Sequence, residues 1–487
     1  MKTAQEYIES LRGLKRELYV LGERVEDFTE HPILRPSLNA LAKTYEMAHE
    51  PRCAELFVRQ GLDGECVNCF TSLHHSTHDL LNKVKALRLL GQETGTCLQR
   101  CVGWDALNAL ESTAFEMDRA LGTPYHDRFL DYLRYVQQQD LVCNGAMTDV
   151  KGNRRLRPGQ QADPDLYLHV VEQRPDGIVV RGAKAHQTGA VFSHEIIVMP
   201  TLGLRAEEKS YAVAFAIPSD AKGVLHILGR QSCDTRKLEG SSMDVGNATF
   251  GAHEALVVFD DVFVPNERVF MNGEWQFSGM LVERFAGYHR QSYGGCKVGM
   301  GDVLIGAAAA AAEYAGVDDA SHVRRKLAEM THLNETLFAC GIACSVAGTA
   351  LPSGTYLVDQ LLANVCKQNV TRFPYEIARL AEDLAGGLMV TLPSERDLNH
   401  PEIGRFVDKY LRGAADIPTA DRMRILRLIE NLTLGAAAVA YRTESMHGAG
   451  SPEAQVIMIA RLSNLEGKKA LARRLAGVKL MDSHCIS

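Results

Sequence analysis

The sequence lacks an apolar run long enough to cross a membrane. The longest, Val303 to Ala312, is far shorter than the ~20 residues that a membrane helix needs. The first residues, MKTAQEYIESLRGLKREL, also lack the apolar core of a signal peptide. Neither sign of charge dominates, because 53 Lys and Arg stand against 60 Asp and Glu, a net charge of −7. These absences predict a soluble cytoplasmic protein without a nucleic-acid partner, in which any anionic ligand needs a local basic pocket.

Internal repeats and low-complexity segments are missing as well, and 46% hydrophobic against 23% charged residues is ordinary globular usage. The one unusual count is twelve cysteines in 487 residues. In the cytoplasm thiols stay reduced, so these cysteines are expected to be buried small hydrophobes or ligands rather than disulfide partners.

The hydrophobic pattern changes twice along the chain. Residues 1–143 have the periodicity of helices, 144–277 are rich in β-branched residues and turn signals such as Pro175-Asp176-Gly177, and 278–487 return to helical periodicity with an Ala-rich run. This order predicts an α+β protein with a helical N-terminal domain, a middle β domain and a C-terminal helical domain.

Two cysteines are spaced for one face of a helix. Gly91 is expected to end one helix, and Thr94 or Thr96 to begin the next, which would carry Cys97 and Cys101. Residues four apart in a helix lie about 5–6 Å apart at Cβ. A place in the first turn favours the thiolate, which is the form that binds metals. The alternative is a pair of core cysteines.

Two other cysteine pairs have similar spacing but a different setting. Cys340 and Cys344 sit among small apolar residues, and Cys66-Val67-Asn68-Cys69 has no second such pair nearby. Packing is the expected role of both pairs, because spacing alone cannot identify ligands.

The segment 287–297, GYHRQSYGGCK, is dense in reactive side chains. It sets a His, a Cys, two Tyr and a Lys beside two glycines, which permit backbone conformations closed to other residues. His289 and Cys296, with Cys97 and Cys101, would complete a Cys3His set. Such a set suits tetrahedral zinc or an iron–sulfur cluster with one imidazole ligand, and the residues do not separate the two.

Two carboxylates and two glycine-containing segments complete the candidates. Glu254 precedes an apolar strand and Glu444 follows an Ala-rich helix, so either could be a general acid or base. Residues 184–189 (KAHQTG) and 382–387 (EDLAGG) offer small donors and backbone amides for a cofactor. No G-x-G-x-x-G follows a strand, which argues against a Rossmann nucleotide site.

Taken together, CLQRC, AGYHRQSYGGCKVG, GAKAHQTG, FGAHEALVVFD and YRTESMHGAG resemble the 4-hydroxybutyryl-CoA dehydratase family over nearly the whole chain. The resemblance is weakest at 349–355 and 394–419. It implies a fold like that of acyl-CoA dehydrogenases and a homotetramer.

The resemblance also implies roles for individual residues. The [4Fe–4S] ligands would be Cys97, Cys101, His289 and Cys296. The FAD contacts would be Met147, Thr148, Asp149, His186, Gln187, Thr188, Gly386 and Gly387. The catalytic residues would be His289 as the base for the C2 proton, together with Tyr293, Glu254, Glu444 and Lys297.

The implied reaction converts 4-hydroxybutyryl-CoA to crotonyl-CoA and water, with isomerisation of vinylacetyl-CoA to crotonyl-CoA. The thioester acidifies the C2 proton but not the C3 proton, so the family uses a flavin radical mechanism with iron as a Lewis acid. The alternatives are a flavin-dependent monooxygenase or acyl-CoA dehydrogenase on the same scaffold, and a structural Cys3His zinc protein.

Overall fold

The computed structural model describes residues 1–478. The first part contains α1 (Ala4–Arg12), β1 (Glu17–Val20), β2 (Glu23–Arg24), α2 (Arg35–His49), α3 (Ala54–Phe57), β3 (Val58–Gln60), β4 (Cys66–Asn68), α4 (Thr77–Thr94), α5 (Cys101–Leu121) and α6 (Tyr125–Gln138). The middle part contains β5 (Cys143–Ala146), β6 (His169–Arg174), β7 (Gly177–Thr188), β8 (Glu195–Val198), β9 (Val213–Pro218), β10 (Val224–Leu228), β11 (Glu254–Pro265) and β12 (Val269–Asn272).

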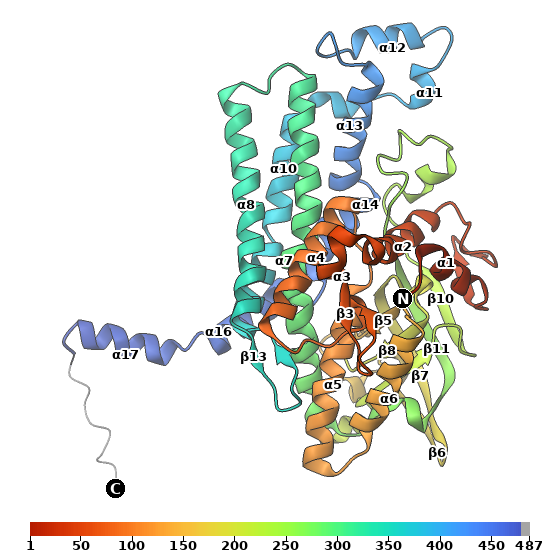
Figure 1. Cartoon of the computed structure of the whole chain (residues 1–487), viewed down its shortest axis with the longest axis vertical. Coiled ribbons are helices and arrows are strands. Elements are labelled where there is room, and N and C mark those ends of the chain that lie inside the picture. The colour runs from red at the N-terminus through yellow and green to blue at the C-terminus, as the bar shows by residue number, and fades with distance from the viewer. Residues whose placement is uncertain (479–487) are drawn as a thin grey trace.

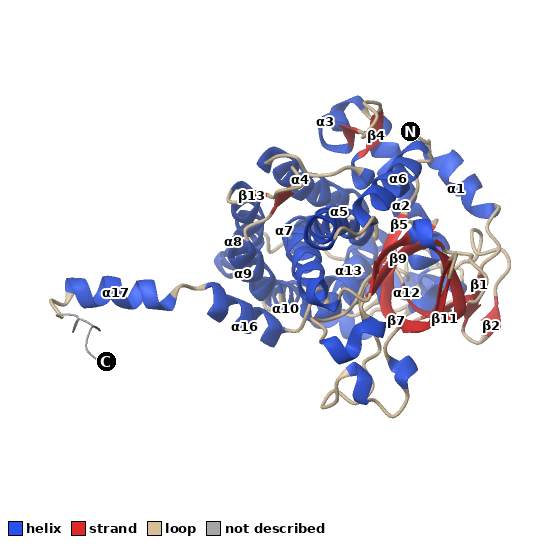
Figure 2. Cartoon of the chain, turned by 90° about the horizontal axis from the view of Figure 1, so that it is seen from below, coloured by secondary structure: helices blue, strands red, loops and turns tan. Residues whose placement is uncertain are grey.

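The last part is mostly helical. It contains α7 (Trp275–Tyr314), α8 (Ser321–Val346), β13 (Thr349–Ala350), β14 (Tyr356–Leu357), α9 (Gln360–Val370), α10 (Phe373–Ala385), α11 (Glu395–Leu398), α12 (Gly404–Tyr410), α13 (Thr419–Thr433), α14 (Ala436–Ala438), α15 (Glu444–His447), α16 (Pro452–Leu462) and α17 (Leu465–Leu475). Its long helices form a bundle beside the sheets (Figures 1 and 2). The predicted α+β order of helices, strands and helices is therefore confirmed.

The strands form two main sheets, ordered β2-β1-β10-β11-β7-β6 and β12-β9-β8-β5. The turn predicted at Pro175-Asp176-Gly177 joins β6 to β7. Strands β1 and β2 were not expected, because residues 1–143 read as helical. Strand β1 pairs in parallel with β10, as in Glu17 with Leu225, so its conformation depends on a partner about 200 residues away.

The helix boundaries near Cys97 and Cys101 differ from the prediction. Helix α4 continues past Gly91 and ends at Gly95, whose φ of 62° is the left-handed cap that glycine favours. Helix α5 begins only at Cys101. The prediction of one helix carrying both cysteines was wrong: Cys97 lies in the loop before α5.

Helix α7 is the central element of the bundle, and its glycines serve packing. Gly294 and Gly295 are helical, so the expectation of unusual backbone there was wrong. A Cβ on Gly294 would lie 2.6 Å from the Cα of Gly341 in α8, and one on Gly295 would lie 2.4 Å from the carbonyl oxygen of Val84 in α4. The glycine pair therefore allows α4 and α8 to approach α7 on two sides.

One described helix, α7, is long and apolar enough to cross a membrane by length and composition alone. Two thirds of its apolar window (67%) is buried inside the protein, as expected for the core helix of a bundle. In contrast, α17 extends away from the rest of the molecule (Figures 1 and 2), and none of its residues is buried.

Candidate active site

Three side chains from α5 and α7 converge in the interior. The ligand atoms of Cys101, Asp105 and His289 all lie within 4.8 Å of one another, and the three residues are buried. Cys101 and Asp105 are one helical turn apart at the start of α5, and His289 faces them from α7. Within residues 1–478 this is the one group of three side chains placed to hold a metal ion.

Asp105 links His289 to a buried cation. One carboxylate oxygen lies 2.8 Å from Nδ1 of His289, and the other accepts a hydrogen bond from the ammonium of Lys83 in α4. The side chains of Lys83 and Asp105 are completely buried. With Nδ1 held by the carboxylate, Nε2 of His289 is the nitrogen left for a metal or a proton.

Sequence analysis did not identify Asp105 or Lys83. Asp105 could have been found from its spacing, because a carboxylate four residues after Cys101 lies on the same helix face. Lys83 had no such signal, since its partner lies on another helix.

Replacing Asp105 with Asn should lower the free energy of unfolding by about 3–5 kcal/mol, because the buried ammonium of Lys83 loses its counter-ion. Chemical denaturation measures this loss. The matched control is Glu376→Gln, which breaks an exposed ion pair with Arg379 and should cost less than about 1 kcal/mol. Equal effects of the two substitutions would contradict a structural role for the Lys83–Asp105 pair.

Cys97 and Cys296 lie near this group, although they reach it from a loop and from α7. Burial, followed by the charges of Cys97 and Cys296, raises the pKa of Cys101 well above its usual range. Burial also raises the pKa of Cys296 to about 11. The expected thiolate-favouring helix terminus is therefore outweighed by burial, and these thiols need a bound cation to ionise. Three buried sulfurs and an imidazole fit a thiolate-binding metal centre.

The two cysteine pairs predicted to pack lie elsewhere. Cys344 is buried in α8, where its thiol contacts the Gly341 carbonyl at 3.2 Å, while Cys340 is half-buried. Cys66 is exposed and Cys69 is buried. Neither pair belongs to the group of potential metal ligands found within the described part of the chain.

A second set of polar side chains surrounds Tyr293, which lies four residues after His289 in α7. The π-helical turn Val439–Thr443 leads into Glu444, the first residue of α15. Nζ of Lys297 lies 2.7 Å from Oε2 of Glu444 and 2.6 Å from the carbonyl oxygen of Ala440. Its ammonium also lies 5.0 Å from the centre of the Tyr293 ring. Although burial alone would lower the pKa of Lys297, the Glu444 carboxylate holds it above its ordinary value.

Lys367 of α9, which sequence analysis missed, also lies over the ring of Tyr293. Its ammonium is 5.2 Å from the ring centre of Tyr293 and donates a hydrogen bond to the carbonyl of Ser445. Burial, and then the charge of Lys297, lower the pKa of Lys367 to about 7. The buried hydroxyl of Tyr293 has no hydrogen-bond partner in the described part of the chain. A buried, unpaired hydroxyl on a ring that faces two ammonium groups fits contact with a bound group.

Replacing Gly448 with Ala should displace Tyr293. The new Cβ would lie 2.0 Å from the Tyr293 hydroxyl oxygen, so overpacking should lower the free energy of unfolding by about 1–3 kcal/mol. The control Gly306→Ala, in α7 with nothing within 4 Å, should keep or slightly raise stability. Thermal unfolding compares the two variants, and an unchanged midpoint for Gly448→Ala would contradict the close contact.

The charge of Glu444 acts on the buried carboxyl group of Glu254. Both oxygens of the Glu254 carboxylate lie 2.8 Å from Oγ1 of Thr188, its neighbour across β7 and β11. Burial, and then the charge of Glu444, raise the pKa of Glu254 well above its usual range. Two carboxyl groups in unlike environments at one site can divide the roles of acid and base.

Of the three segments predicted to contact FAD, two lie together in the structure. Residues 147–149 and 184–188 meet where the amide of Ala185 donates to the Thr148 carbonyl at 2.8 Å. The carboxylate of Asp149 is 2.9 Å from Nζ of Lys184, and both side chains are buried. Because the carboxylate of Asp149 already pairs with Lys184, a cofactor at this place would contact the backbone of the neighbouring residues rather than this carboxylate.

The remaining predicted cofactor residues differ in accessibility. His186 is exposed, whereas Gln187 is buried with its side-chain oxygen unpaired in the described structure. The exposed pair Gly386–Gly387 lies at the end of α10, and the turn Gly387–Thr391 contacts α10 and α13. Contact of Gly386 and Gly387 with FAD stays a prediction.

Family comparisons cover nearly the whole chain. Residues 3–271 match the family described as 4-hydroxyphenylacetate 3-hydroxylase N terminal, and residues 278–477 match 4-hydroxyphenylacetate 3-hydroxylase C terminal. A curated relative from Clostridium aminobutyricum, named 4-hydroxybutyryl-CoA dehydratase/vinylacetyl-CoA-Delta-isomerase, is 59% identical over 98% of this chain and 100% of its own. A 4-hydroxyphenylacetate 3-monooxygenase oxygenase component from Thermus thermophilus is 29% identical over 97% and 96%.

Solved structures agree with these relatives. An oxygen-tolerant archaeal 4-hydroxybutyryl-CoA dehydratase from N. maritimus matches with a TM-score of 0.97 and 54% identity, covering 100% of this chain and 97% of that one. The oxygenase component HpaB of 4-hydroxyphenylacetate 3-monooxygenase, complexed with FAD, matches with a TM-score of 0.86 and 26% identity over 98% of each chain. The predicted fold and family resemblance are confirmed.

Proposed function

The chain belongs to the 4-hydroxyphenylacetate 3-hydroxylase family and, within it, to the 4-hydroxybutyryl-CoA dehydratases, and from this premise we propose that it dehydrates 4-hydroxybutyryl-CoA to crotonyl-CoA. It also isomerises vinylacetyl-CoA to crotonyl-CoA. The observation that carries the proposal is the buried group of Cys101, Asp105 and His289. Together with Cys97 and Cys296, this group offers thiolates that a flavin monooxygenase does not need.

The same residues define where the cofactors would be held. Cys97, Cys101, Cys296 and His289 would hold a [4Fe–4S] cluster, and residues 147–149 and 186–188 would contact FAD. The FAD-bound relative supports the flavin, and the buried donor set supports the cluster. When bound, the two groups supply one-electron exchange and a Lewis-acidic iron for the departing hydroxyl.

The protein's own residues manage the protons. The thioester acidifies the C2 proton of the substrate, and His289, oriented by Asp105 through Nδ1, would accept it at Nε2 on release from a weak bond to iron. Glu444, held by Lys297, and Glu254, whose pKa is raised by burial, would relay or position the second proton. Tyr293 would donate a hydrogen bond from its otherwise unpaired hydroxyl.

The proposed assembly is a cytoplasmic homotetramer. Support comes from α17, which extends from the body with Leu465, Leu471 and Leu475 exposed. Exposed leucines on a projecting helix are typical of a segment that packs on another copy of the chain.

Iron, acid-labile sulfide and flavin analysis of anaerobically purified protein tests the proposal, together with assays on 4-hydroxybutyryl-CoA and vinylacetyl-CoA. Iron, sulfide, FAD and crotonyl-CoA formation are expected. Zinc without sulfide or flavin would instead identify a structural Cys3His protein. Flavin without iron, with oxygen-dependent hydroxylation, would identify a monooxygenase.

A further inference from the structure

The segment between β5 and β6 carries positive charges that the proposed function does not use. Lys151, Arg154 and Arg155 stand close together in the sequence, and Arg157 follows them. Nε of Arg157 lies 2.7 Å from a carboxylate oxygen of Glu208. For the other three, no carboxylate oxygen among residues 1–478 lies within 4.0 Å of a side-chain nitrogen. Three neighbouring cations without a protein counter-ion attract an anionic ligand.

Hydrogen bonds fix the backbone that presents these charges. Oε1 of Gln161 accepts a hydrogen bond from the amide of Asn153 at 3.0 Å. Nε2 of Gln161 donates to the carbonyl oxygens of Asn153 and Leu156, at 2.9 Å and 3.1 Å. Lys151 has a φ of 73°, in the left-handed region that a lysine rarely adopts. The cations are therefore held in a defined arrangement before any ligand binds.

The start of this segment lies against the end of β7. Asp149 and Lys184 form an antiparallel bridge between the two strands. The amide of Ala185 donates to the carbonyl of Thr148 at 2.8 Å. His186, the next residue of β7, therefore lies beside the segment that carries the cations.

Basic groups from three parts of the chain gather at this place. Burial, and then the charges of Lys151, His447 and Arg154, lower the pKa of His186 below its ordinary value. Because charges are largely screened beyond about 10 Å, these groups lie near one another. His447 is the last residue of α15, and Glu444 is the first. The positive group therefore lies about one helical turn from the carboxylate expected to handle protons.

Exposed apolar side chains stand beside these cations. Val150 and Leu156 are 40% and 37% exposed, on the same segment as Lys151 and Arg154. A surface that alternates positive and apolar side chains suits a ligand with both phosphate and apolar portions.

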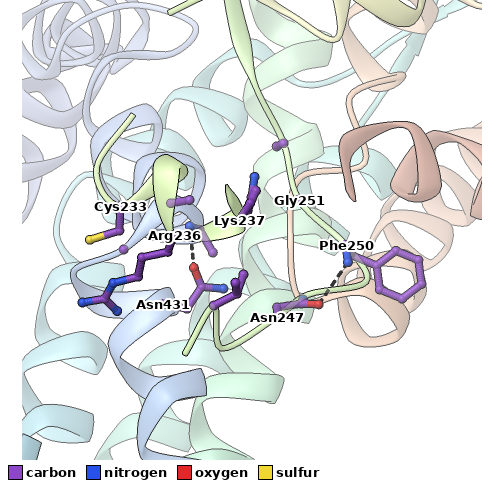
Figure 3. A pocket seen from close by; sticks show the side chains of 12 residues that line it. Cys233, Arg236, Lys237, Asn247, Phe250, Gly251 and Asn431 are labelled. Atoms are coloured by element: carbon purple, nitrogen blue, oxygen red, sulfur yellow. Dashed lines mark hydrogen bonds between the residues drawn. The ribbon is translucent and has the colours of Figure 1, made fainter. Parts of the chain in front are cut away.

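A second group of basic side chains lines a cavity beside α14, but that cavity is too small for such a ligand. Arg236, Lys237 and Asn247 line it (Figure 3). Its volume of about 20 Å³ has room for about one water molecule. Arg154 and Arg155 are exposed instead, so a large phosphate ester can reach them.

We propose that Lys151 and Arg154 bind a phosphate group of the acyl-CoA substrate, with Val150 and Leu156 against its apolar portions. The proposal rests on the proposed function. A CoA thioester carries its phosphates at one end and reacts at the other, so a protein of net charge −7 must bind it through a local group of cations. FAD also carries phosphates. The nearness of His447, on the helix that begins at Glu444, favours the ligand that exchanges protons there.

Binding of butyryl-CoA, which lacks the 4-hydroxyl group, tests the proposal on the FAD- and cluster-loaded enzyme. Arg154→Gln and Lys151→Gln should each raise its Kd about tenfold, because each removes a charged partner of the phosphate. Neither should change the Kd of S-butyryl-pantetheine, which lacks phosphate. The control Lys222→Gln, in the exposed turn between β9 and β10, should change neither Kd. An unchanged Kd of butyryl-CoA in either variant, or an equal loss for S-butyryl-pantetheine, would overturn the proposal.

Acetylation of the native enzyme provides a second test without substitution. Butyryl-CoA at several times its Kd should slow the reaction of Lys151 with acetic anhydride about fivefold, because the bound phosphate covers the amine. The rate at Lys222 should not change. Equal rates at Lys151 with and without butyryl-CoA would contradict the proposed site.

The phosphate site and the proposed function fail in different ways. Loss of FAD in Arg154→Gln would assign the cations to the flavin phosphates and overturn the substrate assignment. Native butyryl-CoA binding with full dehydration activity in Arg154→Gln would overturn the phosphate site but leave the dehydratase function standing. Absence of any CoA-thioester binding by the loaded native enzyme would overturn both.

Discussion

Glu444→Gln is expected to retain iron, sulfide and FAD but to form crotonyl-CoA from 4-hydroxybutyryl-CoA about 10³-fold more slowly than the native enzyme. The amide has the shape of the carboxylate and can still accept a hydrogen bond from Lys297, which lies 2.7 Å away. It cannot accept a proton at neutral pH. The loss should therefore appear in kcat rather than in KM, since only the chemical steps need the proton transfer.

Two measurements separate this catalytic effect from a structural one. Glu453→Gln, an exposed substitution in the next helix α16, is the control and should keep full activity. Cofactor content and the thermal midpoint of Glu444→Gln should equal those of the native protein. Full activity in Glu444→Gln would remove this residue from the catalytic machinery, and a loss explained by missing FAD would make it structural.

Cys296→Ser is expected to abolish dehydration by removing a cluster ligand. Iron should fall from about four atoms per chain to fewer than about one, because a serine hydroxyl is a far poorer iron ligand than a thiolate. Cys296 is buried on α7, next to Lys297 and one turn beyond Tyr293. Iron and acid-labile sulfide analysis of the anaerobically purified variant measures the loss.

Cys340→Ser is the matched control for that experiment. Cys340 has the same spacing to Cys344 as Cys97 has to Cys101, but it is half-buried in α8, 3.7 Å from the side chain of Asn369. Its substitution should leave iron and activity unchanged. Loss of iron in Cys340→Ser, with iron retained in Cys296→Ser, would show that the wrong cysteines were chosen as ligands.

Local patterns predicted the parts of the structure that depend on neighbours in sequence. The period of apolar residues predicted the helical parts, and Pro175-Asp176-Gly177 predicted the turn between β6 and β7. The boundaries proposed at 143/144 and 277/278 remain predictions, and the second falls within the first turn of α7, which begins at Trp275. A pattern locates elements well and their ends poorly, because end geometry depends on the packing of the next element.

Strands β1 and β2 show the opposite case. Neither has a periodic pattern long enough to predict a strand, and β1 forms because β10 provides its hydrogen-bond partners. The glycines of α7 were noticed in the sequence for their backbone freedom. Their actual role, the approach of α4 and α8, depends on which helices lie beside them.

The sequence by itself determined the family, the α+β order, and the residue types from which a Cys3His centre and a pair of carboxylates could be built. The tertiary structure alone decided that Cys97 belongs to a loop, that Lys83 and Asp105 orient His289, and that Lys367 shares the ring of Tyr293. The physical reason is that a motif records spacing within one element. Burial, charge pairing and the pKa values that follow arise between elements far apart in the chain.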